Sequence, residues 1–157
     1  MNKPIQSKHT FKALWKQPED VDRYLRQKAE GYTLNVCSGE SPLGDVQIDA
    51  DRERAPDVVG DMYNLPFPGA TFDTVLFGPP WKLEYFDRQT PFVECVRVCK
   101  PDGLILMNAL WMGESENTEI EKDANGQTEC ILRADDRWAN ISAIVPHRKQ
   151  AGQTTLT

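Results

Sequence analysis

The sequence predicts an α/β fold built on a compact, mostly parallel sheet. The first observation behind this expectation is a series of short, nearly continuous apolar runs, which are typical of strands buried on both faces. The second is that helical and loop segments alternate with these runs, as they do in chains that return across a parallel sheet. The third is a pair of strand-like runs near the C-terminus, which are spaced for an antiparallel hairpin.

A helix is expected first, over residues 19–29. Pro18 precedes it, acidic residues occupy its first turn, basic residues follow, and Gly31 ends it. A second helix is expected over residues 91–99, with a turn at 101–103 behind it. The apolar runs that predict parallel strands lie at residues 32–36, 46–49, 58–59, 72–77 and 104–108.

Beyond the fifth strand the pattern changes. The polar, Gly-containing stretch 113–128 predicts an exposed loop. Residues 129–134 and 139–146 are the two apolar runs of the expected C-terminal antiparallel hairpin.

Two of the expected connections are short. Only nine residues, 37–45, separate the first two strands, and eight, 50–57, separate the second from the third. A parallel crossover normally takes a dozen residues or more and includes a helix. The sequence therefore predicts shortened first crossovers, made of loops or single helical turns.

Length and charge limit the classes of protein. A chain of 157 residues fits one domain, with an N-terminal helical segment over 1–30 and a frayed tail over 150–157. The net charge is −6, and residues 1–30 hold seven Lys and Arg against four Asp and Glu. A net positive charge is therefore found only in the N-terminal segment, which disfavours a broad phosphate-binding stripe. Because neither a membrane span nor a secretory signal is evident, we expect a cytoplasmic protein without a membrane partner.

The cysteines predict core positions rather than a metal site. None of the four has Cys-x-x-Cys spacing, and His9 and His147 are the only histidines, so no bound metal is expected. Cys95 and Cys99 share one face of the second expected helix, and we interpret them as small apolar core residues.

Residues suited to a nucleoside follow the expected strands. In an open parallel sheet, ligands bind beyond the carboxyl ends of the strands. The first strand ends in Cys37, Ser38 and Gly39, which allow close backbone approach and add a hydroxyl. The second ends in Asp49, a carboxylate that can accept hydrogen bonds from ribose hydroxyls, with Asp51 as an alternative.

The third and fourth strands end in complementary groups. Asp61 can accept a hydrogen bond from an adenine amino group, and the Met62 amide can serve a ring nitrogen. After the fourth strand, two prolines fix the backbone and an aromatic ring offers a stacking surface. These residues are Gly78, Pro79, Pro80 and Trp81.

Three stretches of this sequence resemble the class I, Rossmann-like S-adenosylmethionine (SAM)-dependent methyltransferases. Residues 34–39, Leu-Asn-Val-Cys-Ser-Gly, are similar to the Leu-Asp-Leu-Gly-x-Gly loop that contacts SAM. Residues 60–75 resemble a Gly-Asp-x-x-x-Leu-Pro-Phe stretch followed by Phe-Asp-x-Val. Residues 93–103 resemble the Glu-x-x-Arg-Val-Leu-Lys-Pro-Gly-Gly segment before strand five. The resemblance covers residues 32 to 112.

The resemblance implies a SAM site and the class I methyltransferase sheet, with strands four and five beside strand one. It implies that Cys37, Ser38 and Gly39 line the methionine end of SAM, and it adds Gly78 to the cofactor-binding residues. Asp49 would hold the ribose, with Asp51 as the alternative. The remaining cofactor residues it implies, for adenine, are Asp61 and Met62.

Residues 78–81, Gly-Pro-Pro-Trp, resemble the Asp-Pro-Pro-Trp motif of amino-methyltransferases that act on adenine or cytosine. In that family the acid and a proline carbonyl bind the exocyclic amine, and the aromatic ring stacks on the base. The resemblance assigns catalytic positions to Pro79, Pro80 and Trp81. The motif is degenerate here, because Gly78 stands where that family has an acid. In the stretch that resembles the SAM loop, Asn35 likewise replaces an acid.

Three hypotheses follow. The first is methyl transfer from SAM to an amino group, with a nucleic-acid base, a small molecule or a protein side chain as acceptor. The second, motivated by Gly78, is a SAM-binding protein without transferase activity, acting as a sensor or a partner-dependent subunit. The third is a Rossmann-like domain for another nucleotide, which the missing Gly-x-Gly-x-x-Gly and phosphate-loop signatures disfavour. The sequence leaves the oligomeric state open.

Overall fold

The computed structural model describes residues 19–80, 87–109, 113–122, 124, 131–133 and 142–151. In these ranges two α-helices, one 3-10 helix and eight strands are formed. They are α2 (Glu19–Lys28), β1 (Thr33–Val36), β2 (Val46–Asp49), η1 (Arg52–Arg54), β3 (Val58–Val59), β4 (Phe72–Phe77), α3 (Gln89–Val98), β5 (Cys99–Asn108), β6 (Thr118–Ile120), β7 (Ile131–Arg133) and β8 (Ser142–Lys149).

The strands form one mixed sheet in the order β3-β2-β1-β4-β5-β8-β6, with β7 also paired to β8. β1 to β5 run parallel, and β8 is antiparallel to β5. The order of the strands reverses between β1 and β4, so the carboxyl ends of these two strands form the switch point where open sheets bind ligands. The expected mostly parallel sheet of the Rossmann-like methyltransferase pattern is confirmed, as is the antiparallel pairing of the C-terminal runs.

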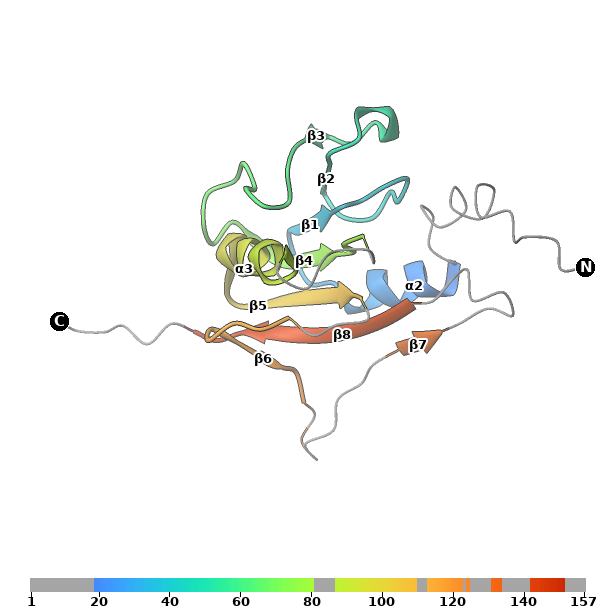
Figure 1. The fold of residues 1–157 in the computed structure, drawn as a ribbon. Helices are drawn as coiled ribbons and strands as arrows, with labels where there is room; N and C mark the ends of the chain where they lie inside the picture. Colours follow the sequence, from blue (N-terminus) through green and yellow to red (C-terminus); the bar gives the residue numbers. More distant parts are fainter. Residues whose placement is uncertain are drawn as a thin grey trace, which may run out of the picture.

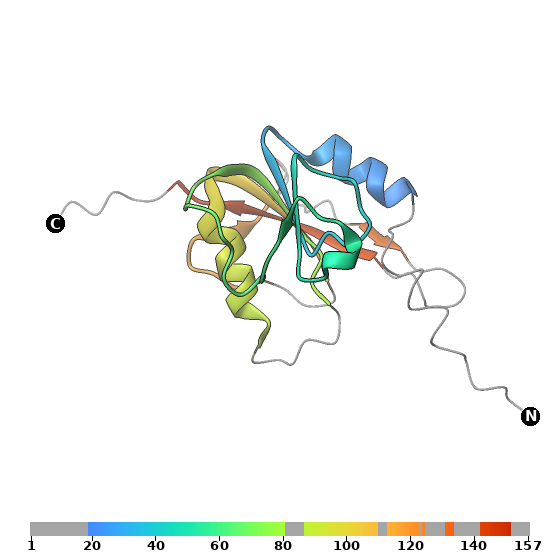
Figure 2. The same ribbon diagram turned by 90° about the horizontal axis from the view of Figure 1, so that it is seen from above.

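The two α-helices cover opposite faces of the sheet (Figures 1 and 2). α3 packs Phe92, Cys95 and Val96 onto the larger core, which includes Val75 and Ile105. The α2 side holds a smaller core, whose members are Val21, Leu25, Leu43, Leu76, Leu104, Leu106 and Ile144. Successive residues of β4 and β5 alternate between these cores, which is the period-2 pattern of a sheet covered on both faces.

The shortened first crossovers are confirmed. Individual side chains of these loops pack against the sheet and bind its backbone, where a longer crossover would place a helix. Residues 37–45 form a loop that inserts Leu43 into the α2-side core. Asp45 accepts a hydrogen bond from the Thr33 amide at 2.9 Å. Asp57 accepts one from the Gln47 amide, also at 2.9 Å. Each bond satisfies a backbone donor near the start of a strand, a contribution of about 1 kcal/mol.

Two sequence expectations about the last strands were wrong in detail. The expected loop 113–128 contains β6, which pairs with Arg148 and its neighbours along the edge of β8 that β7 leaves open. The Gln150 amide donates to the Asn117 carbonyl at 2.8 Å, and most of the expected frayed tail, residues 152–157, lies outside the described residues. β8 extends to Lys149, beyond the expected end at 146, because β6 supplies hydrogen bonds to its second half.

The junction of α3 and β5 also differs from the expectation. The helix ends at Val98, and Cys99, whose amide caps the helix by donating to the Cys95 carbonyl, is already the first residue of β5. The expected turn lies inside β5 as an irregularity, where the partners of β4 jump from Cys99 to Leu104 and Asp102 has a φ of +64°. Cys95 and Cys99 are fully buried in the larger core, as expected.

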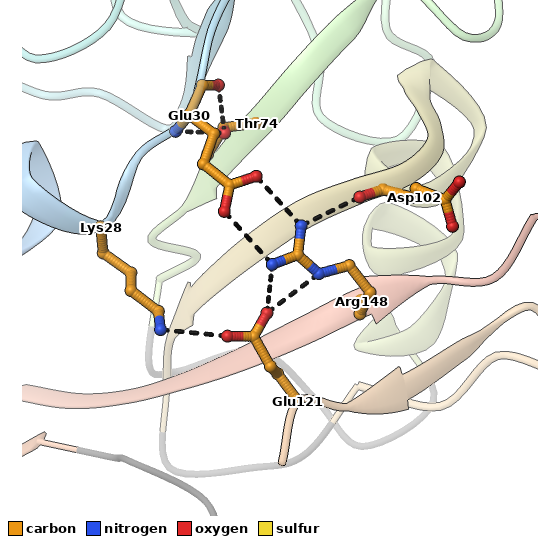
Figure 3. A network of polar contacts seen from close by, with 6 residues as sticks. All are labelled: Lys28, Glu30, Thr74, Asp102, Glu121 and Arg148. Atoms are coloured by element: carbon orange, nitrogen blue, oxygen red, sulfur yellow. Dashed lines mark hydrogen bonds and ion pairs between the residues drawn. The ribbon is translucent and has the colours of Figure 1, made fainter. Parts of the chain in front are cut away.

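Arg148 of β8 ties the C-terminal strands to the first helix (Figure 3). Its guanidinium binds the Glu30 carboxylate at 3.1 Å, the Asp102 carbonyl at 2.9 Å and the Glu121 carboxylate. Lys28, at the end of α2, donates to the other oxygen of Glu121 at 3.0 Å. Segments that are far apart in the chain are therefore joined by one half-buried charge network.

Candidate functional site

The loop after β1 is the first part of the candidate site. Cys37 has a φ of +59°, a left-handed conformation that reverses the chain at the end of the strand. The Ser38 amide then donates to the Ile48 carbonyl of β2 at 3.2 Å. The Ser38 hydroxyl is buried and has no hydrogen-bond partner within the described ranges, so it is an open polar group at the switch point.

Asp49, at the end of β2, holds this loop in place. One of its carboxylate oxygens accepts from the Gly39 amide at 2.8 Å, and the other accepts from the Asp51 amide at 2.8 Å. The side chain is 8% exposed. Because a carboxylate oxygen offers two lone pairs, each oxygen retains capacity for a ligand hydroxyl.

The alternative carboxylate, Asp51, has a different role. It is exposed, and it caps η1 by accepting from the Glu53 amide at 3.0 Å. Its other oxygen lies 3.3 Å from Nε of Arg54. Asp51 therefore organises the shortened crossover, and Asp49 is the better placed of the two for a ligand.

Asp61 and Met62 bring the segment after β3 to the same place. Met62 is half-buried, and its sulfur lies 3.5 Å from the Cys37 thiol. Asp61 is exposed, and one of its oxygens accepts from the Tyr63 amide at 2.9 Å. The two stretches that the sequence assigned to opposite ends of one ligand thus meet side by side.

The electrostatics of this cluster are negative. Burial, followed by the charges of Asp49 and Asp61, raises the pKa of the Cys37 thiol to about 12. Partial burial, and then the charges of Asp87, Asp61 and Cys37, raise the pKa of the Tyr63 phenol. Cys37 therefore stays a neutral thiol at neutral pH, which argues against its use as a nucleophile.

Residues 78–80 stand beside the cluster, at the end of β4. The Gly78 amide donates to the Val36 carbonyl at 3.3 Å, which sets the two strand ends together. A Cβ at Gly78 would meet no atom of the described chain within 4 Å. Pro79 is buried and Pro80 is exposed. Trp81, the fourth member of the motif, lies outside the described residues.

Asn35 faces away from the site. Its side-chain amide donates to the Ser41 hydroxyl and to the Leu43 carbonyl, both at 3.2 Å. The residue that replaces the family's acid in the SAM loop therefore supports the crossover that carries Leu43 into the core.

Sequence reasoning missed the Glu94–Arg97 pair of α3. Arg97 donates to the carbonyls of Phe67 at 2.8 Å and Leu65 at 2.9 Å, and Glu94 accepts from the Leu65 amide at 2.8 Å. The pair also bonds to itself, with Nε of Arg97 2.8 Å from Glu94. Both stretches were recognised as motifs, but only their contact shows that α3 anchors the segment behind Met62.

The donor set fits SAM. The unpartnered Ser38 hydroxyl can serve the polar methionine end, Asp49 keeps lone pairs for a ribose, and the negative cluster suits a sulfonium cation. No group of three metal-binding side chains occurs among the described residues. The helices found in these ranges are too short and polar to cross a bilayer.

Comparisons with known proteins agree with this arrangement. A family model described as a methyltransferase domain matches residues 21–107. A search of the curated proteins finds no match.

Several solved structures share the fold at low identity. A 1,6-didemethyltoxoflavin-N1-methyltransferase from Burkholderia thailandensis is 10% identical, with a TM-score of 0.58 over 96% of this chain and 92% of its own. The N-methyltransferase NodS from Bradyrhizobium japonicum, solved with S-adenosylhomocysteine, is 12% identical, with a TM-score of 0.55 over 93% and 87%. The [4+2]-cyclase SpnF is 16% identical, with a TM-score of 0.55 over 85% and 80%.

These structural likenesses are likenesses of fold, and the cyclase among them shows that the fold serves more than one reaction. The family match is more specific, since it spans the strand ends that form the candidate site. From the first helix to the end of β5, the chain belongs to the methyltransferase-domain family.

Proposed function

We infer that this protein binds SAM at the carboxyl ends of β1 to β4 and transfers its methyl group to an amino group. The observation that carries the proposal is the contact of the Cys37–Gly39 loop with both Asp49 and Met62, beside the reversal of strand order. When bound there, SAM supplies an electrophilic methyl group on a sulfonium. The family match and the neighbour solved with S-adenosylhomocysteine support this cofactor.

The residues around the site would bind and orient rather than form a covalent intermediate. The Ser38 hydroxyl would receive the methionine end, Asp49 the ribose, and Asp61 with the Met62 amide the adenine. Methyl transfer needs an aligned acceptor and a setting that tolerates the loss of positive charge. The prolines at 79 and 80 would present backbone carbonyls to the acceptor amine, with Trp81 as a stacking surface.

The acceptor is proposed only as a class. The degenerate motif at 78–81 favours an amine on a flat ring, as in a nucleic-acid base. A small molecule or a protein side chain is the alternative. The acidic net charge favours a small molecule over a long nucleic acid, because phosphate backbones require basic surface.

SAM affinity is the first test. At one hundred times its dissociation constant, SAM should add about 2.7 kcal/mol to the free energy of unfolding, measured by thermal shift and calorimetry. Asp61→Ala should weaken binding with little loss of stability, because the Asp61 side chain is exposed. Asp49→Ala should lower both the SAM affinity and the free energy of unfolding, because Asp49 also accepts two backbone hydrogen bonds.

Asp57→Ala is the matched control, since it removes a backbone cap away from the strand ends and should lower stability without changing SAM affinity. The absence of any shift at millimolar SAM would overturn the cofactor assignment. Equal affinity in the Asp61→Ala variant would remove Asp61 from the site.

A second candidate function, SAM binding without transfer, is favoured by one observation. Gly78 offers no side-chain acceptor where the family has an acid. Among the described residues no atom lies within 4 Å of a Cβ built at Gly78, and its backbone is outside the left-handed region, so these residues leave room for an aspartate.

Gly78→Asp should therefore fold normally and, if the glycine is disabling, raise methylation at least tenfold. The assay is transfer of label from tritiated SAM to adenosine, cytidine and a mixed-sequence single-stranded DNA. Gly78→Ala, which adds a Cβ but no acceptor, is the control. Ordinary turnover by the wild-type protein would dispose of the non-transferase alternative.

A further inference from the structure

A hollow of about 480 Å³ is lined by residues of β6 and of the segment before it. β6 itself pairs with β8 at the edge of the sheet (Figure 1). One side chain of β8 also lines the hollow. The lining side chains that carry the argument are Glu114, Ser115, Glu116, Thr118, Glu119 and His147.

The walls of this hollow are held by specific contacts. Gly113 packs against the ring of Phe92, and a Cβ there would come within 2.3 Å of that ring. The Glu114 amide donates to the side chain of Gln89 at 2.8 Å. At the other end, Thr118 pairs with Lys149 of β8. The segment is therefore fixed against α3 at its start and against β8 at its end.

His147 contributes a buried hydrogen-bond acceptor. Its side chain is 1% exposed, and its Nδ1 lies 3.1 Å from the Val145 carbonyl. A carbonyl only accepts hydrogen bonds, so Nδ1 carries the proton, and burial lowers the pKa of the imidazole and keeps it neutral. Nε2 is then an acceptor, and within the part of the chain that the structure describes it has no partner.

The rim of the hollow carries negative charge. Glu114, Glu116 and Glu119 are all exposed. The nearby cations of β8 are engaged elsewhere. Lys149 donates to the carbonyls of Val96 and Cys99, both at 2.8 Å, and Arg148 binds Glu30 and Glu121.

We propose that this hollow binds a small organic amine in its protonated form, with His147 Nε2 accepting an N–H bond and the rim carboxylates attracting the charge. The two observations are independent. A lone buried acceptor calls for a hydrogen-bond donor, and three carboxylates select a cation. An alkylammonium group satisfies both needs at once. The proposal does not depend on methyl transfer, because the lining of the hollow shares no residue with the candidate SAM site.

The test is an NMR titration of the ¹⁵N-labelled full-length chain with n-butylamine at pH 7, with n-butanol as the neutral isostere. The amine should shift the His147 Nε2 resonance and the amides of residues 113–120, and the alcohol should not. Replacing each rim carboxylate should weaken binding about threefold, as expected for a charge roughly 6 Å away in a water-like medium. The double variant Glu116→Gln/Glu119→Gln should therefore lose about tenfold.

Glu19→Gln removes one exposed carboxylate from α2 and is the matched control, with no expected loss of amine affinity. These glutamates are exposed, so the variants should fold, and His147→Phe adds a test of the acceptor if it also folds. Equal binding of butanol, an unmoved His147 resonance, or the same affinity in the double variant as in Glu19→Gln would each overturn the proposal. The absence of binding at 20 mM amine would also overturn it, because a single ammonium group that binds weakly, with a dissociation constant of roughly 20 mM, would still be detected at that concentration.

Discussion

Replacing Arg97 with alanine is expected to lower the free energy of unfolding by about 2 kcal/mol, an amount limited by the 39% exposure of its side chain. The guanidinium makes hydrogen bonds to the carbonyls of Leu65 and Phe67 and to the Glu94 carboxylate. Its loss removes one donor from the Leu65 and Phe67 carbonyls and removes the charged partner of Glu94, which still accepts from the Leu65 amide. Removing one partner of such a set costs more than the bond itself contributes. Urea unfolding gives the change in free energy directly.

The same substitution should reduce SAM affinity about tenfold, equivalent to about 1.4 kcal/mol. Met62 and Asp61 directly precede the anchored segment, and without Arg97 the ligand must order that segment as it binds. Arg97→Lys is the informative control, because lysine keeps the charge but cannot donate in the two-pronged geometry. If Arg97→Lys had the wild-type stability and SAM affinity, the positive charge would be responsible for both, and the paired hydrogen bonds to Leu65 and Phe67 would not.

Acid should diminish the difference between the wild-type protein and Arg97→Ala. The hydrogen bond from Arg97, opposed by burial, leaves the pKa of Glu94 below its ordinary value of 4.5. A depressed carboxyl pKa contributes stability that is complete above the ordinary value and is lost as the pH falls through the folded-state value. A difference in stability that stays constant from pH 6 down to pH 3 would contradict the assignment.

Arg148→Ala is the second large effect, with an expected loss of about 2 kcal/mol in the free energy of unfolding. The guanidinium binds Glu30, Glu121 and the Asp102 carbonyl at the meeting point of α2, β5 and β6 (Figure 3). Its side chain is 27% exposed, so the loss should be smaller than for a fully buried pair. The hydrogen bond from Lys28 to Glu121 does not involve Arg148 and should remain.

Hydrogen exchange should localise the damage to β6, since Arg148 holds the residue that follows that strand. Arg23→Ala is the matched control, because the Arg23–Glu19 contact is 4.0 Å long and highly exposed, and it should change stability by less than about 0.5 kcal/mol. A loss of stability without faster exchange at Thr118–Ile120 would show that Arg148 stabilises the whole fold and does not dock β6 in particular.

Much of the sheet could be predicted because its signals are local. β2 and β4 have the bounds that their apolar runs indicate, and each stops at polar or Pro-Gly residues. β6 could not be found in this way, because Thr-Glu-Ile within a polar stretch has no strand pattern of its own. It forms because β8 offers an unpaired edge, and that edge exists only once the sheet has assembled.

The candidate site divides along the same line. The sequence alone predicts which residue types follow β1 to β4. It also predicts that the first crossovers are short. Which carboxylate holds the loop after β1 was decided by tertiary structure, because Asp49 accepts from the Gly39 amide while Asp51 caps η1. Likewise, Asn35 supports Leu43, and α3 anchors the segment behind Met62, through contacts between residues distant in the chain. Local patterns determine where strands end, but hydrogen-bond partners across the assembled sheet determine which of their terminal groups remain available to a ligand.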